Sequence, residues 1–267
     1  MRDRRPDRGR LVSSGPAPSY DTDAAAYFAA MSAPPDDTRK GLINQLVLDL
    51  KLAGVWVKLD WLCLFASHDQ QSALLNLAVP AKSAIAVNSP IFTTDRGFTG
   101  DGAAAYLNFN ESVTGGDRKA TLNDVEAFAY CNLQGASSGA TGYHFSQATS
   151  SFRLVIAAHA SGNDTFRAHD NASGTARAST DRKGFRAAAR ADSANRRAYY
   201  NGSLTASLAT AVTGTTALAA QALRSGIASY SDDRLACVGW GQNLDDTQNA
   251  ALHTALHTYL TAIGASY

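Results

Sequence analysis

The chain has 267 residues, of which 45% are hydrophobic and 18% are charged, and its formal net charge is +1. This composition is typical of a globular protein with enough apolar residues for a core, and the near-neutral charge gives no reason to expect binding to nucleic acid or to a membrane surface. No apolar run approaches the roughly 20 residues that cross a bilayer, and the N-terminus lacks the apolar segment of a secretory signal, so we expect a protein made in the cytoplasm without a membrane span.

The first segment, residues 1–18, is basic and contains Gly, Pro and Ser. We interpret it as a flexible arm, because such a sequence cannot bury enough apolar surface to offset the entropy lost on ordering. A plain disordered end is the preferred interpretation. An arm that docks onto nucleic acid or a particle is the alternative.

Residues 19–72 have a helical apolar pattern. Asp21 and Asp23 can cap a short helix, and Pro34–Asp37 begins a second one with acidic residues at the positive end of its dipole. Val55–Ala66 is apolar enough to form a third, largely buried helix. We predict a helical appendage that either packs on the following domain or forms an interface with another chain.

From Leu74 almost to the C-terminus, clusters of Gly, Asn, Asp, Ser and Thr recur at short intervals, which indicates many turns. The dipeptide Asn201-Gly202 predicts a tight hairpin, because its turn requires positive φ angles. Short strands separated by turns are typical of an antiparallel sandwich, which we assign to residues 73–267. The candidate strands are 103–109, 125–131, 152–158, 184–191, 197–200 and 234–240, the last with apolar residues on both faces.

A helix is expected after the last strand. Asp245 is a suitable N-cap with Gln248 at the spacing of a capping box, and Gly264 suits the position after the helix C-terminus. One face of this helix is apolar and carries Leu252, Leu256, Tyr259, Leu260 and Ile263. Its end signals and its apolar face predict a helix that closes the domain.

Two sets of residues could suggest a metal site. His253 and His257 lie one helical turn apart, a spacing that can bind zinc, but no third ligand is evident and we assign both to a polar outer face. Cys63, Cys131 and Cys237 are far apart in apolar contexts, which favours buried reduced thiols over a disulfide or a zinc site. No metal is predicted from either set.

Three segments resemble the concanavalin A-like lectin/glucanase, or laminin-G-like, jelly roll. They are Gly97–Gly102, the alternating strand 184–191, and Arg197–Ser203 with its Tyr-Tyr-Asn-Gly hairpin. The segment from Tyr20 to Asp60 and the C-terminal strand and helix resemble proteins of tailed phages and prophages. In those proteins, short N-terminal helices precede such a jelly roll. The resemblance covers about residues 20–264 and implies a mainly β fold, an antiparallel β-sandwich with an N-terminal helical appendage and a C-terminal helix.

The resemblance also implies a function. It indicates a non-enzymatic virion structural protein, such as a spike, fibre or tail-associated adhesin, that binds host-surface polysaccharide. Its N-terminal helices would dock it to other virion proteins or to sister copies in a homo-oligomer, and no nucleic-acid partner is expected. It would be made in the host cytoplasm and located in the virion. A purely structural decoration or adaptor protein is an alternative.

A glycan-cleaving enzyme on the same fold is a further alternative. Glycanases of this fold use a Glu-x-Asp-x-x-Glu strand motif, which places carboxylates about 5 Å apart for acid–base chemistry. In this chain Asp124 and Glu126 would share a strand face, but the third carboxylate is missing. Two solvated acids at the start of a strand are the preferred interpretation.

Two segments that appear loop-rich, residues 141–147 and 163–171, mix aromatic rings with Asn, Asp, Arg and His. Sugars are held by aromatic faces that stack on C–H patches and by polar groups that bond to hydroxyls. The candidate glycan-binding residues are Tyr143, His144, Asn163, Asp164, Arg167, His169, Asp170, Asn171 and Trp240, with Tyr230 as a further aromatic surface. For Trp240, as for Phe145 and Phe166, a place in the sandwich core is the preferred interpretation.

Calcium is considered because the resemblance implies it, since many laminin-G-like domains carry calcium at their rim. Asp164, Asp170 and Asp181 could supply oxygen ligands. No spacing motif supports this, and no cofactor is predicted.

Overall fold

The computed structural model describes residues 19–136, 142–149, 151, 153–160, 162–172, 174–226 and 229–267. The predicted N-terminal arm lies outside the described residues. Within them, no helix is long and apolar enough to cross a membrane.

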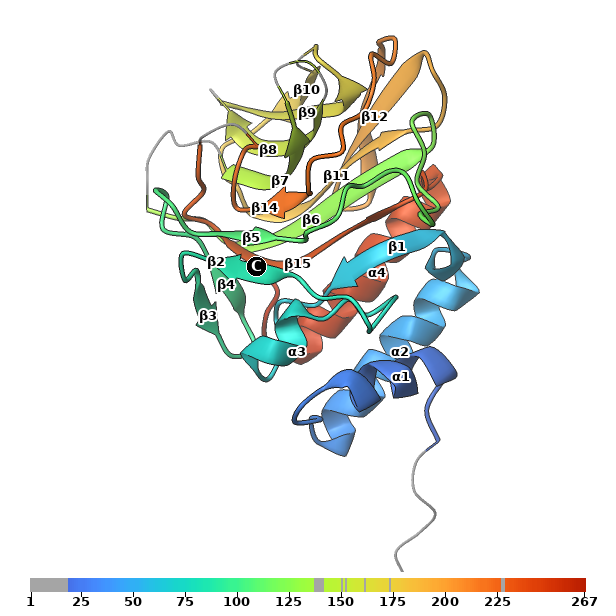
Figure 1. The fold of residues 1–267 in the computed structure, drawn as a ribbon, viewed down its shortest axis with the longest axis vertical. Helices are drawn as coiled ribbons and strands as arrows, with labels where there is room; N and C mark the ends of the chain where they lie inside the picture. The colour runs from blue at the N-terminus through green and yellow to red at the C-terminus, as the bar shows by residue number, and fades with distance from the viewer. Residues whose placement is uncertain are drawn as a thin grey trace, which may run out of the picture.

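The described strands form two antiparallel sheets that face each other, as predicted (Figure 1). The eight-stranded sheet has the order β13 (Ser203–Ala209), β12 (Asn195–Tyr200), β11 (Gly184–Arg190), β6 (Val125–Leu133), β15 (Arg234–Gly241), β4 (Gly97–Thr99), β3 (Ile91–Thr93), and β1 (Leu59–Cys63) also pairs with β15. The seven-stranded sheet has the order β10 (Gly174–Ala178), β9 (Asn163–Asp170), β8 (Arg153–Ala160), β7 (Gly142–Ala148), β14 (Gln221–Ala222), β5 (Tyr106–Asn108), β2 (Ile85–Val87).

The helices are α1 (Thr22–Ala30), α2 (Asp37–Leu52), the short α3 (Gln70–Leu74) and α4 (Asp246–Ala262). Their starts follow the predicted capping chemistry, because Asp21 accepts from the backbone N–H of Asp23 and Asp36 from that of Arg39. Asp245 and Gln248 form the expected capping box, and Gly264 has a φ of 70° after the end of α4.

The predicted third helix, Val55–Ala66, is wrong. A 3₁₀ turn (Trp56–Lys58) leads into β1, which pairs with β15. Along this segment Trp61, Cys63 and Phe65 enter one core, whereas Leu62, Leu64 and Ala66 enter the other. A strand buried on both faces has apolar residues at every position, which hides its period of two.

The first core lies between the sheets. Trp61 and Trp240 stack with ring centroids 4.9 Å apart and planes 12° apart, and the edge of Phe109 meets Trp240 at 5.0 Å. All three side chains are buried. This aromatic cluster joins strands from both sheets and fixes their spacing.

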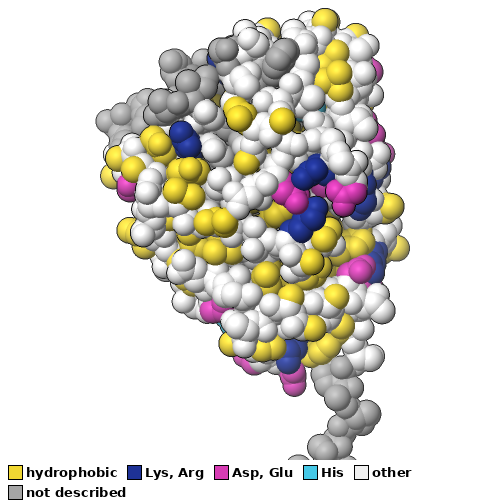
Figure 2. All heavy atoms as spheres, viewed as in Figure 1, with side chains coloured by type: hydrophobic (Ala, Val, Ile, Leu, Met, Phe, Trp, Pro, Cys, Tyr) yellow, Lys and Arg dark blue, Asp and Glu magenta, His cyan; other side chains and the backbone are white. Residues whose placement is uncertain are grey.

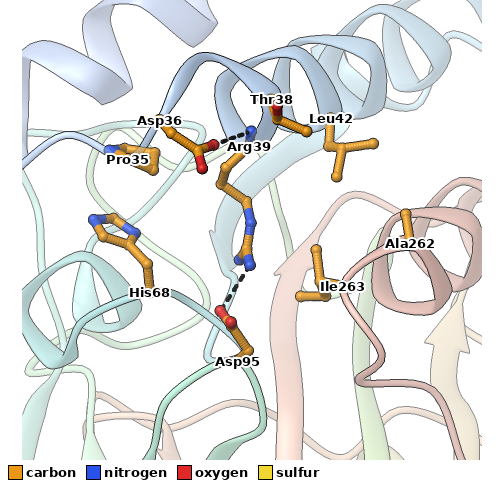
Figure 3. Close-up of a pocket in the computed structure, with 9 residues that line it drawn as sticks. All are labelled: Pro35, Asp36, Thr38, Arg39, Leu42, His68, Asp95, Ala262 and Ile263. Carbon is orange, nitrogen blue, oxygen red and sulfur yellow. Dashed lines mark hydrogen bonds and ion pairs between the residues drawn. The ribbon is translucent and has the colours of Figure 1, made fainter.

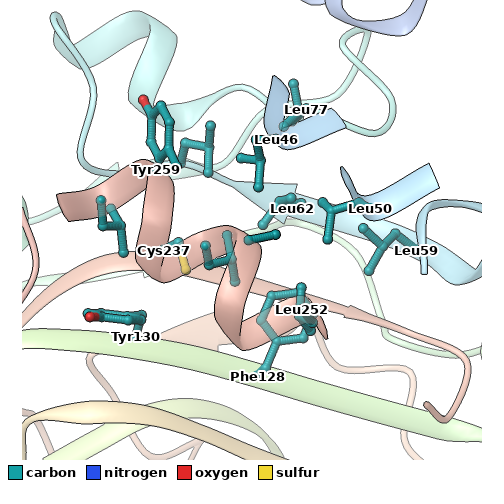
Figure 4. Close-up of a cluster of buried hydrophobic side chains, with 14 of the residues drawn as sticks. Leu46, Leu50, Leu59, Leu62, Leu77, Phe128, Tyr130, Cys237, Leu252 and Tyr259 are labelled. Atoms are coloured by element: carbon teal, nitrogen blue, oxygen red, sulfur yellow. The ribbon is translucent and has the colours of Figure 1, made fainter. Parts of the chain in front are cut away.

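The second core lies between the outer face of the eight-stranded sheet and the helices (Figure 4). Leu46 and Leu50 of α2 and Leu252 of α4 pack together with Phe128 and Tyr130 of β6. The helices therefore pack on the sandwich, which is one of the two arrangements expected. They cover the outer face of the eight-stranded sheet (Figure 1).

Candidate functional site

Trp240 does not offer a stacking surface. Its side chain is 0% exposed and lies in the aromatic cluster between the sheets. Its candidate role as a sugar-stacking surface is wrong, and the preferred interpretation as a core residue is confirmed.

The two segments that appeared loop-rich are strands. Residues 142–148 form β7 and residues 163–170 form β9. Because side chains alternate along a strand, Asp164 and Asp170 enter the interior, where they are 3% and 0% exposed. Neither carboxylate is available to a glycan, contrary to the prediction.

Both of these aspartates pair with arginines that cross from other strands. Asp164 lies 3.0 Å from Nε of Arg186 and 2.8 Å from Nε of Arg177. Asp170 lies 3.3 Å from Nη2 of Arg190 and also pairs with Arg196. Buried charges persist only when they are paired, and here the pairs link the sheets. Six residues of strand separate the two aspartates by about 20 Å, so they cannot share a calcium ion.

His144 is also buried and belongs to a polar cluster. Its Nε2 lies 2.9 Å from Oδ2 of Asp233, whose Oδ1 accepts from Nε of Arg182 at 2.7 Å. Burial opposes ionisation of Asp233, but the bonds from His144, Gly135 and Arg182 outweigh it and lower its pKa to about 2. Burial also lowers the pKa of His144.

Cys131 completes this cluster, which sequence reasoning missed because its members are far apart in the chain. Ligand atoms of Cys131, His144 and Asp233 lie within 4.8 Å of one another, a grouping that could hold a metal ion. Because Asp233 already accepts from His144, Gly135 and Arg182, the cluster is explained as a hydrogen-bond network between the sheets.

The remaining predicted glycan residues are spread over the seven-stranded sheet. His169 is buried, and its Nδ1 lies 2.9 Å from the carbonyl of Leu122, so its prediction as a glycan contact is wrong. Asn163 is half-buried at one end of β9, and Asn171 is exposed just beyond the other end. Tyr143 and Arg167 are half-buried on β7 and β9. The structure therefore does not bring the predicted residues together into one site.

Asp124 contacts the segment that leads into α4, and Glu126 contacts both that segment and α4 itself. Asp124 accepts from the backbone N–H of Asn243 at 2.8 Å. Glu126 is 1% exposed and accepts from the N–H of Leu244 and from Nδ2 of Asn249, both at 3.1 Å. The prediction that both are solvated is wrong for Glu126, and a glycan cannot reach its carboxylate in this conformation.

His253 and His257 do not form an outer face. Their rings stack 5.5 Å apart, and Nδ1 of His257 lies 2.7 Å from the hydroxyl of Tyr130 on β6. Burial and the neighbouring His257 lower the pKa of His253 to about 4. The pair is half-buried against the sheet. Here α4 packs on the sheet not only with its aliphatic side chains but also with the neighbouring face that carries the two histidines.

A hollow of about 340 Å³ lies where α2 begins and α4 ends (Figure 3). Figure 3 shows Arg39 reaching from α2 to Asp95, and the ion pair is 2.7 Å long. Asp36 accepts from the N–H of Arg39, and Nε2 of His68 lies 2.7 Å from the carbonyl of Ala33. The charged groups of this hollow satisfy one another, which leaves little to recognise a charged ligand.

A different surface has the chemistry of a binding site. It consists of Tyr106, Arg224 and Tyr230, all half-buried, and we call it the tyrosine–arginine surface. Cζ of Arg224 lies 4.7 Å from the ring centroid of Tyr106 and 5.3 Å from that of Tyr230. The two rings are 6.2 Å apart. Such a cation near two aromatic rings is held by their π electrons.

Tyr230 and Arg224 lie opposite each other in two short backbone segments. They form a β-bridge, and the N–H of Ser231 bonds to the carbonyl of Leu223 at 2.9 Å. Leu223, the residue before Arg224, is 0% exposed and lies in the core between the sheets. The arginine and the tyrosine are thus positioned by backbone pairing and by one buried side chain.

Tyr106 is positioned by the turn before β5. The carboxylate of Asp101 accepts from the backbone N–H groups of Ala103, Ala104 and Ala105 at 2.8–2.9 Å, and these bonds lower the pKa of Asp101. The next residue, Tyr106, begins β5, and Leu107 points into the core. Because side chains alternate along a strand, the side chain of Tyr106 faces away from the core.

Figure 2 shows which kinds of side chain surround the region of β2 and β5 on this face of the molecule. Hydrophobic side chains gather over the flank where β2 and β5 lie, whereas basic and acidic atoms alternate on the opposite side of the view. Charged residues of the region preceding β6 pair with one another, since Glu111 lies 3.1 Å from Lys82 and 3.0 Å from Arg118. Arg224 has no ion-pair or hydrogen-bond partner in the described part of the chain.

Comparison with known proteins identifies the fold. No protein-family model and no curated protein matches the chain. A sialidase from Trypanosoma rangeli matches with a TM-score of 0.57 and 10% identity, over 82% of this chain and 39% of the sialidase. Domain 4 of AbnA, a GH43 extracellular arabinanase from Geobacillus stearothermophilus solved with arabinotriose, matches with a TM-score of 0.50 and 11% identity, over 73% of this chain and 98% of that domain.

These similarities show that the chain has the same kind of β-sandwich fold as the matched parts of these proteins. At such low identities the likeness establishes the fold alone. The chain spans about two fifths of the sialidase that it resembles.

Proposed function

We propose that this protein is a non-enzymatic glycan-binding module, and that the glycan lies on the tyrosine–arginine surface. The observation that carries the proposal is the guanidinium of Arg224, which has no ion-pair partner among the described residues and contacts the rings of Tyr106 and Tyr230. Aromatic rings offer flat apolar area to the C–H face of a sugar, and the guanidinium donates to its oxygens. The lectin-like fold and the arabinotriose complex of the similar arabinanase domain support this proposal.

Tyr143 extends the proposed surface. It lies near the start of β7, and β14 is the one strand between β7 and β5. Two strand spacings correspond to about 10 Å, roughly the length of two sugar rings. A chain of sugars that contacts Tyr106 and Tyr230 would therefore reach Tyr143 or the nearby Arg167.

We further propose that the protein serves as a spike, fibre or tail-associated adhesin of a tailed phage or phage-like particle. The sequence resemblance to such proteins supports this role. The helical layer would face the particle and bind other virion proteins, since α2 exposes Leu52 (91%) and the following turn exposes Val57 (65%). Many copies with weak single sites would then give strong attachment.

Glycan binding is tested with the whole chain on an array of bacterial surface polysaccharides and plant and animal glycans. We expect binding that falls at least tenfold in Tyr230→Leu and in Tyr106→Leu, because each loses a stacking face. Tyr267→Leu is the matched control, since Tyr267 is a tyrosine 41% exposed elsewhere on the molecule and its removal leaves the proposed surface intact. No binding above background by the unaltered protein would contradict the proposal and favour a purely structural role.

The particle role is tested separately. Leu52→Glu and Val57→Glu are expected to reduce incorporation into particles without reducing glycan binding, because they alter only the helical side. Incorporation is measured by quantitative immunoblotting of purified particles. Absence of the unaltered protein from particles would contradict the virion assignment and leave the glycan proposal standing.

A further inference from the structure

The guanidinium of Arg224 has hydrogen-bond donors that no described residue uses. A guanidinium carries five N–H donors in one plane, and aromatic rings attract its charge without accepting its hydrogen bonds well. Nε of Arg224 is buried and has no partner among the described residues. Because Nε is buried, a ligand would have to bind the terminal Nη groups of this half-buried side chain.

The acidic side chains near this surface are already used. Asp101 accepts from three backbone N–H groups of its own turn. Asp232, two residues after Tyr230, lies 3.1 Å from Nη2 of the buried Arg182. The internal residues outside the described ranges include no Asp or Glu. The protein therefore does not supply Arg224 with a carboxylate from these positions.

Other arginines of the sandwich differ in this respect. Arg186 and Arg190 each meet an aspartate, and Arg118 meets Glu111. The buried arginines of the described chain, Arg182, Arg186, Arg190 and Arg196, each meet an aspartate, whose carboxylate matches the planar fork of a guanidinium. Arg224 is half-buried and has no carboxylate partner among the described residues.

We propose that the tyrosine–arginine surface selects acidic glycans, in which a sugar carboxylate binds Arg224 while the sugar ring lies on Tyr106 or Tyr230. This inference rests on the proposed glycan-binding function and names its ligand class: polymers of uronic or sialic acids. A carboxylate can accept two parallel N–H bonds from one guanidinium, whereas a neutral hydroxyl accepts fewer and uncharged ones.

The test compares each acidic polymer with its own neutral form. The probes are polygalacturonate, alginate, hyaluronan and colominic acid, each beside its carboxyl-reduced derivative, and binding to the full chain is measured by biolayer interferometry. We expect at least one acidic polymer to bind at least tenfold more tightly than its reduced form, with weaker binding at higher salt. Tenfold corresponds to about 1.4 kcal/mol.

Variants then assign the preference to the residue. Arg224→Gln is expected to abolish the difference between acidic and reduced polymers, and Arg224→Lys to retain part of it as a point charge. Lys40→Gln is the matched control, because it removes one positive charge from α2, where Lys40 pairs with Asp37. Circular dichroism and thermal unfolding confirm that each variant is folded.

The possible outcomes separate the two proposals. Equal binding of acidic and reduced polymers overturns the acidic preference and leaves glycan binding intact. Binding to none of the polymers, together with an empty glycan array, overturns both. If Arg224→Gln still prefers acidic polymers to their reduced forms, Arg224 is not the residue that selects them. If dextran sulfate binds Arg224→Gln as tightly as it binds the unaltered protein, the binding reflects general charge attraction. Either result overturns the role of Arg224.

Discussion

Burial changes the protonation behaviour of Glu126. From sequence it is a solvated acid, but α4 covers it, and Oε1 has no partner among the described residues. Burial raises its pKa to about 8, against an ordinary value of 4.5, while bonds from Asn249 and Leu244 partly offset the effect. The native protein therefore binds the Glu126 proton more tightly than the unfolded chain does.

This difference predicts a pH dependence of stability. The contribution from protonated Glu126 is complete below about pH 4.5 and is lost as the pH rises through about 8, because the unfolded chain releases the proton first. Glu126→Gln stays neutral at every pH, so its free energy of unfolding should decline less across this range. Urea denaturation at several pH values measures the difference.

The control for this prediction is Glu111→Gln, which removes a carboxylate that pairs with Lys82 and Arg118 near the surface. It should leave the decline in place. Parallel pH profiles for Glu126→Gln and the unaltered protein would contradict the assignment of the shift to Glu126.

Individual site residues were only partly predictable. Tyr230 was recognised as a candidate aromatic surface and is half-exposed. Tyr106 and Arg224 were missed, because they lie 118 positions apart in the chain and meet only through the pairing of β14 with β5. One sequence signal could have identified Tyr106 as a candidate surface residue: it begins a short strand directly after the turn at Asp101.

At the scale of elements, the Asn201-Gly202 hairpin is confirmed and gains a second role. Asn201 and Gly202 have φ angles of 49° and 77°, as the turn requires. A Cβ on Gly202 would lie 3.0 Å from Cα of Ala250 and from Cβ of His253, both in α4. The hairpin therefore also permits close packing of α4.

Gly202→Ala should destabilise the protein by about 1 kcal/mol or more, through the positive φ and through contact with α4. Gly41→Ala is the matched substitution, because Gly41 lies within α2 and a Cβ there meets nothing within 4 Å. It should stabilise by roughly 0.5–1 kcal/mol. Chemical denaturation of both variants measures the change in the free energy of unfolding, which should be negative for Gly202→Ala and positive for Gly41→Ala. Equal changes in the two variants would refute this account.

The error over Val55–Ala66 also belongs to this scale. Its apolar residues fit a buried helix, and their alternation between two cores becomes visible only when β15 is present as a partner. The two segments around β7 and β9 were misread for the opposite reason. Polar residues on a strand usually face solvent, but here Asp164, Asp170 and His144 point inward to meet Arg186, Arg190 and Asp233.

At the scale of the whole molecule, the helices complete a core with the sandwich. Leu46 of α2 is 2% exposed and belongs to that core, whereas Leu48, one position beyond Val47, is 41% exposed. The covered sheet face is therefore closed to ligands by α2 and α4 (Figure 4). Binding surfaces must be sought on the other sheet and along its flank.

Leu46→Ala should cost about 2–5 kcal/mol, since it opens a cavity beneath the helices. Leu48→Ala, on the same helix, should change stability by no more than about 0.5 kcal/mol. Thermal and urea unfolding of both variants check the pair. A Leu46→Ala protein as stable as the unaltered one would show that the helices are a loosely attached appendage.

The sequence by itself determined the antiparallel sandwich, two N-terminal helices, the tight hairpin and the capped C-terminal helix, because these depend on local patterns of turns, caps and apolar spacing. The tertiary structure decided which polar residues are buried, which sheet face is covered, and where Arg224 meets two tyrosines. Those features arise from contacts between distant segments. Burial reverses the expected behaviour of a charged or aromatic side chain, and no local pattern records what will be packed against it.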